Sequence, residues 1–438
     1  MSNTRERSRE RKSAPVTRTG ALIRLLLSRL SLQAILLAIL LAGCGLASAT
    51  PATTTPTTTP TTPSAPAAPR IGVLTMGPGE VFWERFGHDA IVIDDPALAE
   101  PTSYNFGFFD MEEPGFIPRF LRGQMEYMLV ALPLSQDLDY YRRVGRGVRL
   151  QWLDLEPAQA TALAAALAEN AKPENARYRY DYFTSNCTTK VRDALDRALG
   201  GLLLHQTESR STGDTYRSES LRLASPSPWL WLGFDMALGP SGDRALTRWQ
   251  QDFLPRQLAD DLRAVRHPNG RSLVASEVEL LPQRQAPEPT DGSVPLWPWL
   301  LVGTMLALCV ANAGQRLERP LAALAGGYWL LCGLLGTVLI LAWACTDHHA
   351  LWANRNLLLL DPLCLLLLPG ASTLLRGRSP SQRFRILLIL VALLAGLACL
   401  PLWLQVYPQR NGHWIALLLP LHAALAWRWT RQPRPART

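Results

Sequence analysis

Five long apolar stretches fill the C-terminal third of the chain, and they constrain its fold more than any other feature. Each has close to the ~20 residues that a helix needs to cross the hydrocarbon core of a membrane. Soluble helical hairpins are the alternative, but they would require five unusually apolar and uncharged core helices. The pattern therefore predicts an α-helical membrane domain of five spans within residues 295–430. The stretches lie at residues 296–313, 321–344, 356–375, 386–404 and 413–429.

The loops between these stretches differ in charge, and the difference predicts the orientation of the protein. Residues 314–320, residues 376–385 and the C-terminal tail are rich in arginine. Residues 345–356 and 405–414 are much less basic. Because basic loops stay in the cytosol, the chain that precedes five crossings must lie outside. Residues 70–294 are therefore predicted to form an exported, periplasmic domain of a multi-pass protein in the bacterial inner membrane.

The N-terminal region is predicted to be a targeting segment followed by a linker. Eight Arg or Lys residues lead into an apolar run, which is typical of a signal sequence or an uncleaved anchor at residues 1–49. The segment "LAGC" resembles a lipobox, so lipidation of Cys44, cleavage after Ala49 and retention of the segment all stay open. Residues 50–69 are rich in Thr and Pro and are predicted to be a tether without a core. Residues 431–438 are predicted to be a basic cytosolic tail.

The formal charge of +8 is unevenly distributed along the chain, and this argues against a nucleic-acid partner. Residues 70–291 contain 24 basic and 31 acidic residues, a net charge of −7. The other 20 basic residues are accompanied by only 5 acidic ones, and they lie at the two ends and in short loops between apolar stretches. That distribution is typical of a membrane protein.

Cys187 is the only cysteine of the predicted exported domain, so it has no partner there for a disulfide. It follows a strand-like run, "RYRYDYF", and the capping residues "TSN". It opens "CTTKVRDALDRALGG", whose apolar spacing predicts a helix. At a helix N-terminus the dipole and the unpaired N–H groups lower the pKa of a thiol. A buried structural cysteine is an equally open interpretation.

His88 stands just before the apolar run "DAIVI", a predicted strand from which its ring can project toward the start of that helix. A histidine there would serve as base for the thiol and as acid for the leaving group. A surface histidine at a strand edge is the alternative. The predicted strand "YNFGFFD" offers Tyr104 or Asn105 to orient the imidazole. Asn186 is a further candidate for an orienting or oxyanion contact.

The remaining candidates lie in the loop 345–356, on the predicted outer face of the membrane. Its polar residues are candidates for binding a phosphate headgroup or for completing the active site, and an ordinary interfacial loop with a Trp anchor is the alternative. They are His348, His349, Asn354 and Asn356. The exported domain has no closely spaced Cys/His cluster, Walker loop or GxSxG motif. Neither a metal nor another cofactor is therefore expected.

These motifs together resemble those of known enzymes. A histidine followed later by an Asn-Cys pair that opens a helix is similar to the circularly permuted papain-like enzymes, including the NlpC/P60-like group. The set "FGHDAIVI", "YNFGFFD", "FLRGQMEYML", "YDYFTSNCTTKVRDAL" and "TDHHALWANRNLLLLDPL" resembles the DUF4105 family, the Lnb-type bacterial lipoprotein N-acyltransferases. This resemblance covers residues 75–430 and leaves out the targeting segment and the tether.

The resemblance implies a permuted papain-like α+β exported domain with Cys187 as nucleophile and His88 as its base. It also implies the reaction, which moves an acyl chain from a phospholipid donor to the α-amine of a diacylated lipoprotein acceptor. Because a fold does not fix a function, two other classes stay open. One is a thiol amidase or peptidase of the cell wall, or a phospholipase, of the permuted papain-like group. The other is a non-catalytic membrane binding module.

Overall fold

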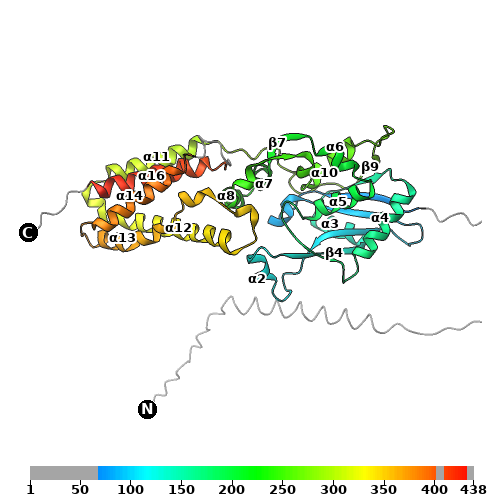
Figure 1. The fold of residues 1–438 in the computed structure, drawn as a ribbon, viewed down its shortest axis with the longest axis horizontal. Helices are drawn as coiled ribbons and strands as arrows, with labels where there is room; N and C mark the ends of the chain where they lie inside the picture. Colours follow the sequence, from blue (N-terminus) through cyan, green and yellow to red (C-terminus); the bar gives the residue numbers. More distant parts are fainter. Residues whose placement is uncertain (1–67, 401–408, 432–438) are drawn as a thin grey trace, which may run out of the picture. The chain divides into compact units, whose positions relative to one another are not determined.

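The computed structural model describes residues 68–400 and 409–431. Within them, a domain built on an antiparallel sheet is followed by a part made of helices (Figure 1). This confirms the predicted succession of an α+β domain and a helical membrane-type domain. The predicted targeting segment 1–49 lies outside the described residues, and so do most of the tether 50–69 and of the tail 431–438.

The main sheet has seven strands, and every pair of neighbouring strands is antiparallel. The strands are β1 (Arg70–Met76), β2 (His88–Asp94), β3 (Thr102–Phe108), β4 (Glu126–Pro133), β5 (Val148–Leu153), β6 (Arg177–Arg179) and β9 (Val274–Leu281). Their order across the sheet is β6-β4-β3-β2-β1-β5-β9. The register pairs Met76 with His88 and Ala90 with Asn105, so the start of β2 lies beside the end of β3.

The two faces of the sheet are covered by different helices, because side chains alternate along a strand. Ile91 and its neighbours on one face pack against helix α5 (Cys187–Ala198). Ala90 and its neighbours on the other face pack against helix α3 (Leu134–Val144). His88 lies two residues before Ala90 in the same strand, so its side chain is on the same face as Ala90, the α3 face, at the end of the sheet.

Shorter elements complete the N-terminal domain. The helical ones are η1 (Phe82–Phe86), α2 (Phe116–Leu121), α4 (Pro157–Asn170), α6 (Leu202–Thr207), α7 (Tyr216–Ala224), α8 (Pro228–Ala237), η2 (Pro240–Asp243), α9 (Arg248–Gln251) and α10 (Pro255–Ala264). A second, two-stranded sheet pairs β7 (Ser211–Thr215) with β8 (Ala245–Thr247).

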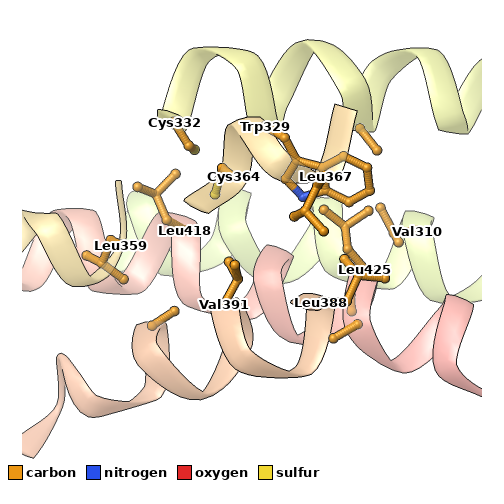
Figure 2. Close-up of a cluster of buried hydrophobic side chains, with 14 of the residues drawn as sticks. Val310, Trp329, Cys332, Leu359, Cys364, Leu367, Leu388, Val391, Leu418 and Leu425 are labelled. Atoms are coloured by element: carbon orange, nitrogen blue, oxygen red, sulfur yellow. The ribbon is translucent and has the colours of Figure 1, made fainter. Parts of the chain in front are cut away.

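The C-terminal part is a bundle of helices around its own apolar core. Its elements are α11 (Trp297–Asn312), η3 (Gln315–Leu317), α12 (Glu318–Cys345), η4 (His349–Leu351), η5 (Arg355–Leu358), η6 (Pro362–Leu367), α13 (Leu368–Leu375), α14 (Gln382–Leu397) and α16 (Gly412–Thr430). Helices α11 and α16 run side by side (Figure 1). Figure 2 shows part of the core, where Trp329, Leu367 and Leu425 come from three different helical segments.

The lengths and outer surfaces of these helices suit a lipid environment. In the described residues, two helical segments are long and apolar enough to cross a membrane, residues 315–345 and 355–375, and residues 297–312 form a shorter apolar helix. Many leucines point away from the core and are exposed, among them Leu324 and Leu393. An outer surface of this kind is unfavourable in water over so large an area.

The helices alternate between two ends of the bundle. At one end the chain contacts the sheet domain: Asp347 donates its backbone N–H to the carbonyl oxygen of Arg122 (2.8 Å). At the other end, Arg428 pairs with Glu318 (2.7 Å) and donates to the carbonyl oxygen of Val310 (3.1 Å). The loop predicted to face outward at residues 345–356 therefore lies at the end that carries the sheet domain.

Candidate active site

Cys187 is the first residue of helix α5, and Asn186 caps that helix. The Asn186 side chain accepts from the backbone N–H of Thr189 (2.9 Å), and Thr189 Oγ1 accepts from the backbone N–H of Asn186 (2.8 Å). The helix predicted from the sequence is confirmed, with its start at the predicted residue. Backbone N–H groups in the first turn of a helix have no partner within it, so the start of α5 gives a positive potential at Cys187.

The Asn186 side chain uses both of its amide hydrogens in this structure. Its two amide hydrogens point to the carbonyl oxygens of Tyr182 (3.0 Å) and Phe253 (2.9 Å). In this structure the amide fixes the start of helix α5: its oxygen caps the first turn, and its nitrogen holds the backbone of Tyr182 and Phe253. An orienting or oxyanion contact of Asn186 stays a prediction.

His88 is held by a chain of hydrogen bonds on the α3 face of the sheet. Its Nε2 lies 3.0 Å from Oδ1 of Asn105. The Asn105 amide nitrogen donates to Asp137 Oδ2 (2.8 Å) and to Ser103 Oγ (3.0 Å), and Ser103 Oγ donates to the same carboxylate oxygen (2.7 Å). These donations fix the amide so that its oxygen accepts from Nε2–H, which leaves Nδ1 of the ring as the atom that can take a proton.

His88 and Cys187 interact with each other, and each shifts the other's pKa. Burial alone would raise the pKa of the Cys187 thiol, but the charge and hydrogen bond of His88 outweigh it, and the pKa lies below its usual value. Burial alone would lower the pKa of His88, but the charge and hydrogen bond of Cys187 raise it above its usual value. Both shifts favour the thiolate–imidazolium form.

A glycine at the end of β3, Gly107, lies next to Cys187. Gly107 has φ +94°, and the pairing of β3 with β4 is irregular between Phe106 and Phe108. A Cβ added to Gly107 would lie 3.5 Å from Cβ of Cys187. That distance is an ordinary van der Waals contact, so the positive φ rather than a lack of space favours glycine at this position.

A buried carboxyl group, Asp89, lies directly beneath the first turn of α5. It is fully buried on the α5 face, next to the hydroxyl groups of Thr75 and Thr188. Burial raises the pKa of Asp89 to about 7, although the charge of His88 and the two hydroxyl groups oppose this shift. When ionised, Asp89 raises the pKa of Cys187, so it modulates the thiol.

Sequence reasoning did not find Asp89, Ser103, Asp137 or Gly107 as parts of this site. Asp137 lies on α3, 32 residues from Asn105, and no local pattern distinguishes it from other acidic residues on helices. Tyr104 was predicted as an alternative to Asn105 for orienting the imidazole. The structure places Tyr104 on the opposite face, in the apolar core against α5, because consecutive residues of a strand alternate.

The loop residues contact the sheet domain rather than forming an open polar site. His348 Nε2 lies 2.9 Å from the carbonyl oxygen of Phe120, and its ring stacks on Tyr182 with centroids 5.9 Å apart. His349 is exposed and packs against Trp352. Headgroup binding by these two histidines stays a prediction.

Asn354 and Asn356 are buried, and both bind the C-terminal end of helix α8. Asn354 donates to the carbonyl oxygens of Met236 (2.9 Å) and Ala237 (2.8 Å), and Asn356 donates to that of Met236 (2.9 Å). The last carbonyls of a helix need such donors when they are buried. These two amides thus join the loop to the domain, and their part in a site at the membrane face stays a prediction.

Other kinds of centre are not formed by the described residues. Nowhere in 68–400 or 409–431 do three or more His, Cys, Asp or Glu side chains come together in a way that could hold a metal ion. The cysteines in these ranges are all free, including Cys187.

Comparison with protein families gives two matches, one in each part of the chain. Residues 61–221 match the model of the Lnb N-terminal periplasmic domain. Residues 294–432 match the model of the Lnb transmembrane domain. Comparison with curated proteins and with solved structures gives no match. The first match includes His88 and Cys187, and the second includes the whole helical part.

Proposed function

The chain belongs to the Lnb family and is a membrane protein with a periplasmic domain, and on that premise we propose that it is a membrane-bound thiol acyltransferase. Its substrates are a phospholipid, which gives up an acyl chain, and a diacylated lipoprotein, whose N-terminal amine accepts it. The observation that carries this proposal is Cys187 at the start of a helix, with its pKa lowered by His88, whose ring Asn105 holds. Such an arrangement activates a thiol for covalent catalysis.

In the first half of the reaction the Cys187 thiolate attacks an ester carbonyl of the phospholipid. A carbon–sulfur bond forms and the carbon–oxygen ester bond breaks, while protonated His88 gives its proton to the departing lysophospholipid oxygen. Negative charge develops on the carbonyl oxygen before that bond breaks. Backbone N–H groups of the first turn of α5 are placed to stabilise it.

In the second half the lipoprotein amine attacks the thioester. A carbon–nitrogen bond forms and the carbon–sulfur bond breaks, and His88 takes the proton that the amine loses. Thiolate and imidazolium are thereby restored. Asn105 and Asp137 keep the ring in one orientation through both halves, so that the same nitrogen gives and takes the proton.

We further infer the setting of this reaction from the two parts of the chain. The helical part crosses the inner membrane five times, with its basic loops in the cytosol. We infer a permuted papain-like arrangement for the sheet domain, since the strand of the histidine precedes the helix of the cysteine. Both substrates are lipids of the outer leaflet, and the contacts of residues 347–356 with the domain hold the site near that leaflet.

The direct test uses full-length protein with a phospholipid and a diacylated lipopeptide. The proposal predicts a triacylated lipopeptide and a lysophospholipid in equal amounts, and neither product from Cys187→Ser or His88→Ala. Lysophospholipid with free fatty acid alone would identify a phospholipase, and cleavage of wall peptides would identify an amidase. If no substrate reacts and Cys187 resists thiol reagents in the folded protein, the chain is a non-catalytic binding module.

A further inference from the structure

We propose that an exposed apolar surface beside Cys187 inserts into the outer leaflet of the membrane, among the acyl chains of its phospholipids. This surface, called the aromatic rim below, consists of residues 81–83, 108–111 and 117–121 together with Trp229. The membrane contact is independent of the proposed function. The inference rests on that function only in taking the rim as the route by which a donor chain reaches the thiol.

The aromatic rim exposes more large apolar side chains than a water-facing surface normally does. Leu121 is 63% exposed and Trp229 is 66% exposed, and six other large apolar side chains of the rim are also exposed to solvent. These others are Val81, Phe82, Trp83, Phe108, Met111 and Ile117. A contiguous apolar patch on a protein surface marks a site of interaction with a protein or a membrane.

The rim is one continuous surface because its aromatic rings contact one another. The ring of Phe82 contacts two tryptophans: its centroid lies 6.4 Å from that of Trp229 and 4.7 Å from that of Trp83. Trp83 meets Phe109 at 6.1 Å, and the contacts continue through Phe116 to Phe120 on helix α2. Segments that are distant in the sequence are thus joined into a single patch.

The rim borders the catalytic groups on two sides. Helix η1 carries Phe82 and Trp83 and ends at Phe86, two residues before His88. Strand β3 ends at Phe108, which follows Gly107, the residue in contact with Cys187. An acyl chain lying against the rim would therefore have its carboxyl end near the thiol.

The rim also lies where helix α12 leaves the membrane. That helix has 28 residues and ends at Cys345. At 1.5 Å per residue it is about 42 Å long, which exceeds the ~30 Å hydrocarbon core. Two residues after its end, Asp347 bonds the backbone of Arg122, and the ring of His348 bonds the carbonyl oxygen of Phe120. Helix α2 is thus fixed at the outer boundary of the membrane.

Two features favour lipid over a protein as the occupant of the rim. The first is this continuity with the membrane-embedded part of the same chain. The second is composition: Trp83 and Trp229 are tryptophans at the predicted membrane–water boundary, where tryptophan is enriched in membrane proteins. A soluble partner would have to compete for the rim with the leaflet that already surrounds it.

Photo-crosslinking of full-length protein in phospholipid nanodiscs tests the membrane contact. A photo-reactive amino acid is placed at Ile117 or, as a control, at Leu98, which lies between β2 and β3 at the other end of the sheet. The two side chains are equally exposed, at 55% and 54%. Several-fold more phospholipid adduct is expected at 117 than at 98. Equal adducts at the two positions, or adducts at 117 only with a second copy of the chain, would overturn the proposal.

Substitution then tests the role of the rim in transfer. The double variant Ile117→Ser, Leu121→Ser changes only exposed side chains and is expected to unfold at the wild-type temperature. It should lose most of its transfer from vesicle phospholipid, whereas Leu98→Ser should transfer at the wild-type rate. Full transfer by the double variant would refute the rim as the route of the donor chain. Lipid adducts at 117 in a protein that makes no triacylated lipopeptide would refute the proposed function and leave the membrane contact intact.

Discussion

Replacement of Asn105 by alanine is expected to slow acylation of Cys187 by roughly 10- to 100-fold. The substitution removes the acceptor for His88 Nε2 and two donors, one of which serves Asp137. A hydrogen bond that involves a charged group contributes about 1.5–3 kcal/mol. Because each 1.36 kcal/mol corresponds to tenfold in rate, the loss of one such bond to the imidazolium gives this range.

The assay follows alkylation of Cys187 by a water-soluble reagent across a range of pH, read by mass spectrometry on the peptide that contains Cys187. In Asn105→Ala the midpoint should move to higher pH, since a less well-held imidazolium stabilises the thiolate less. Ser103→Ala is the matched control: it removes a bond to Asp137 and one acceptor of the Asn105 amide, but it leaves the bond from Asn105 to Asp137 and the one between Asn105 and His88. Its effect on acylation should be much smaller.

A double-mutant cycle separates a positioning role from a merely structural one. If Asn105 acts through the imidazole, Asn105→Ala should not move the pH midpoint of Cys187 alkylation any further when His88 is already alanine. An equal shift of the midpoint in the presence and absence of His88 would refute the reasoning. So would an Asn105→Ala protein that acylates within about twofold of wild type, given the bond energies above.

Four further predictions follow from the site and the topology. Acyl-enzyme formation should rise with pH through the lowered pKa of Cys187 and fall as pH passes the raised pKa of His88, and a profile without the alkaline fall would contradict the ion pair. Asp89→Asn removes a charge that raises the pKa of Cys187, so the alkylation midpoint should move to lower pH; a move to higher pH would reverse the assigned sign. Asn354→Ala should lower the free energy of unfolding by about 1–3 kcal/mol, because the carbonyl groups of Met236 and Ala237 lose donors. An unchanged unfolding temperature would show that Asn354 does not stabilise the end of helix α8. A reporter active only outside the cytoplasm and fused after Arg378 should be silent, and activity there would overturn the five-span topology.

Much of the core of the site follows from local sequence patterns. The capping residues and apolar spacing around Cys187 predict a helix, and α5 begins there. The run "DAIVI" lies within β2, and "YNFGF" lies within β3. The run "RYRYDYF" forms a strand only over Arg177–Arg179, because the chain then turns back on itself with a bridge between Asp181 and Ser185.

What sequence patterns leave undecided depends on how the strands pair. Tyr104 and Asn105 are equally good partners for a histidine until the register of β2 and β3 is known, and the register then puts only Asn105 on the face of His88. Asp137 enters the site through the packing of α3, which no local signal encodes. The polar loop looks like a site from its composition, yet Asn354 is used to complete the end of helix α8.

The central claim is that Cys187 carries the acyl chain, and the mass of the enzyme tests it most directly. Full-length protein is incubated with phospholipid in the absence of a lipoprotein amine, then digested and analysed at the peptide that contains Cys187. An acyl adduct is expected there, lost on treatment with hydroxylamine as a thioester is, and transferred when a diacylated lipopeptide is added. A triacylated lipopeptide formed by a protein that never shows this adduct, or formed at the normal rate by Cys187→Ser, would contradict the account.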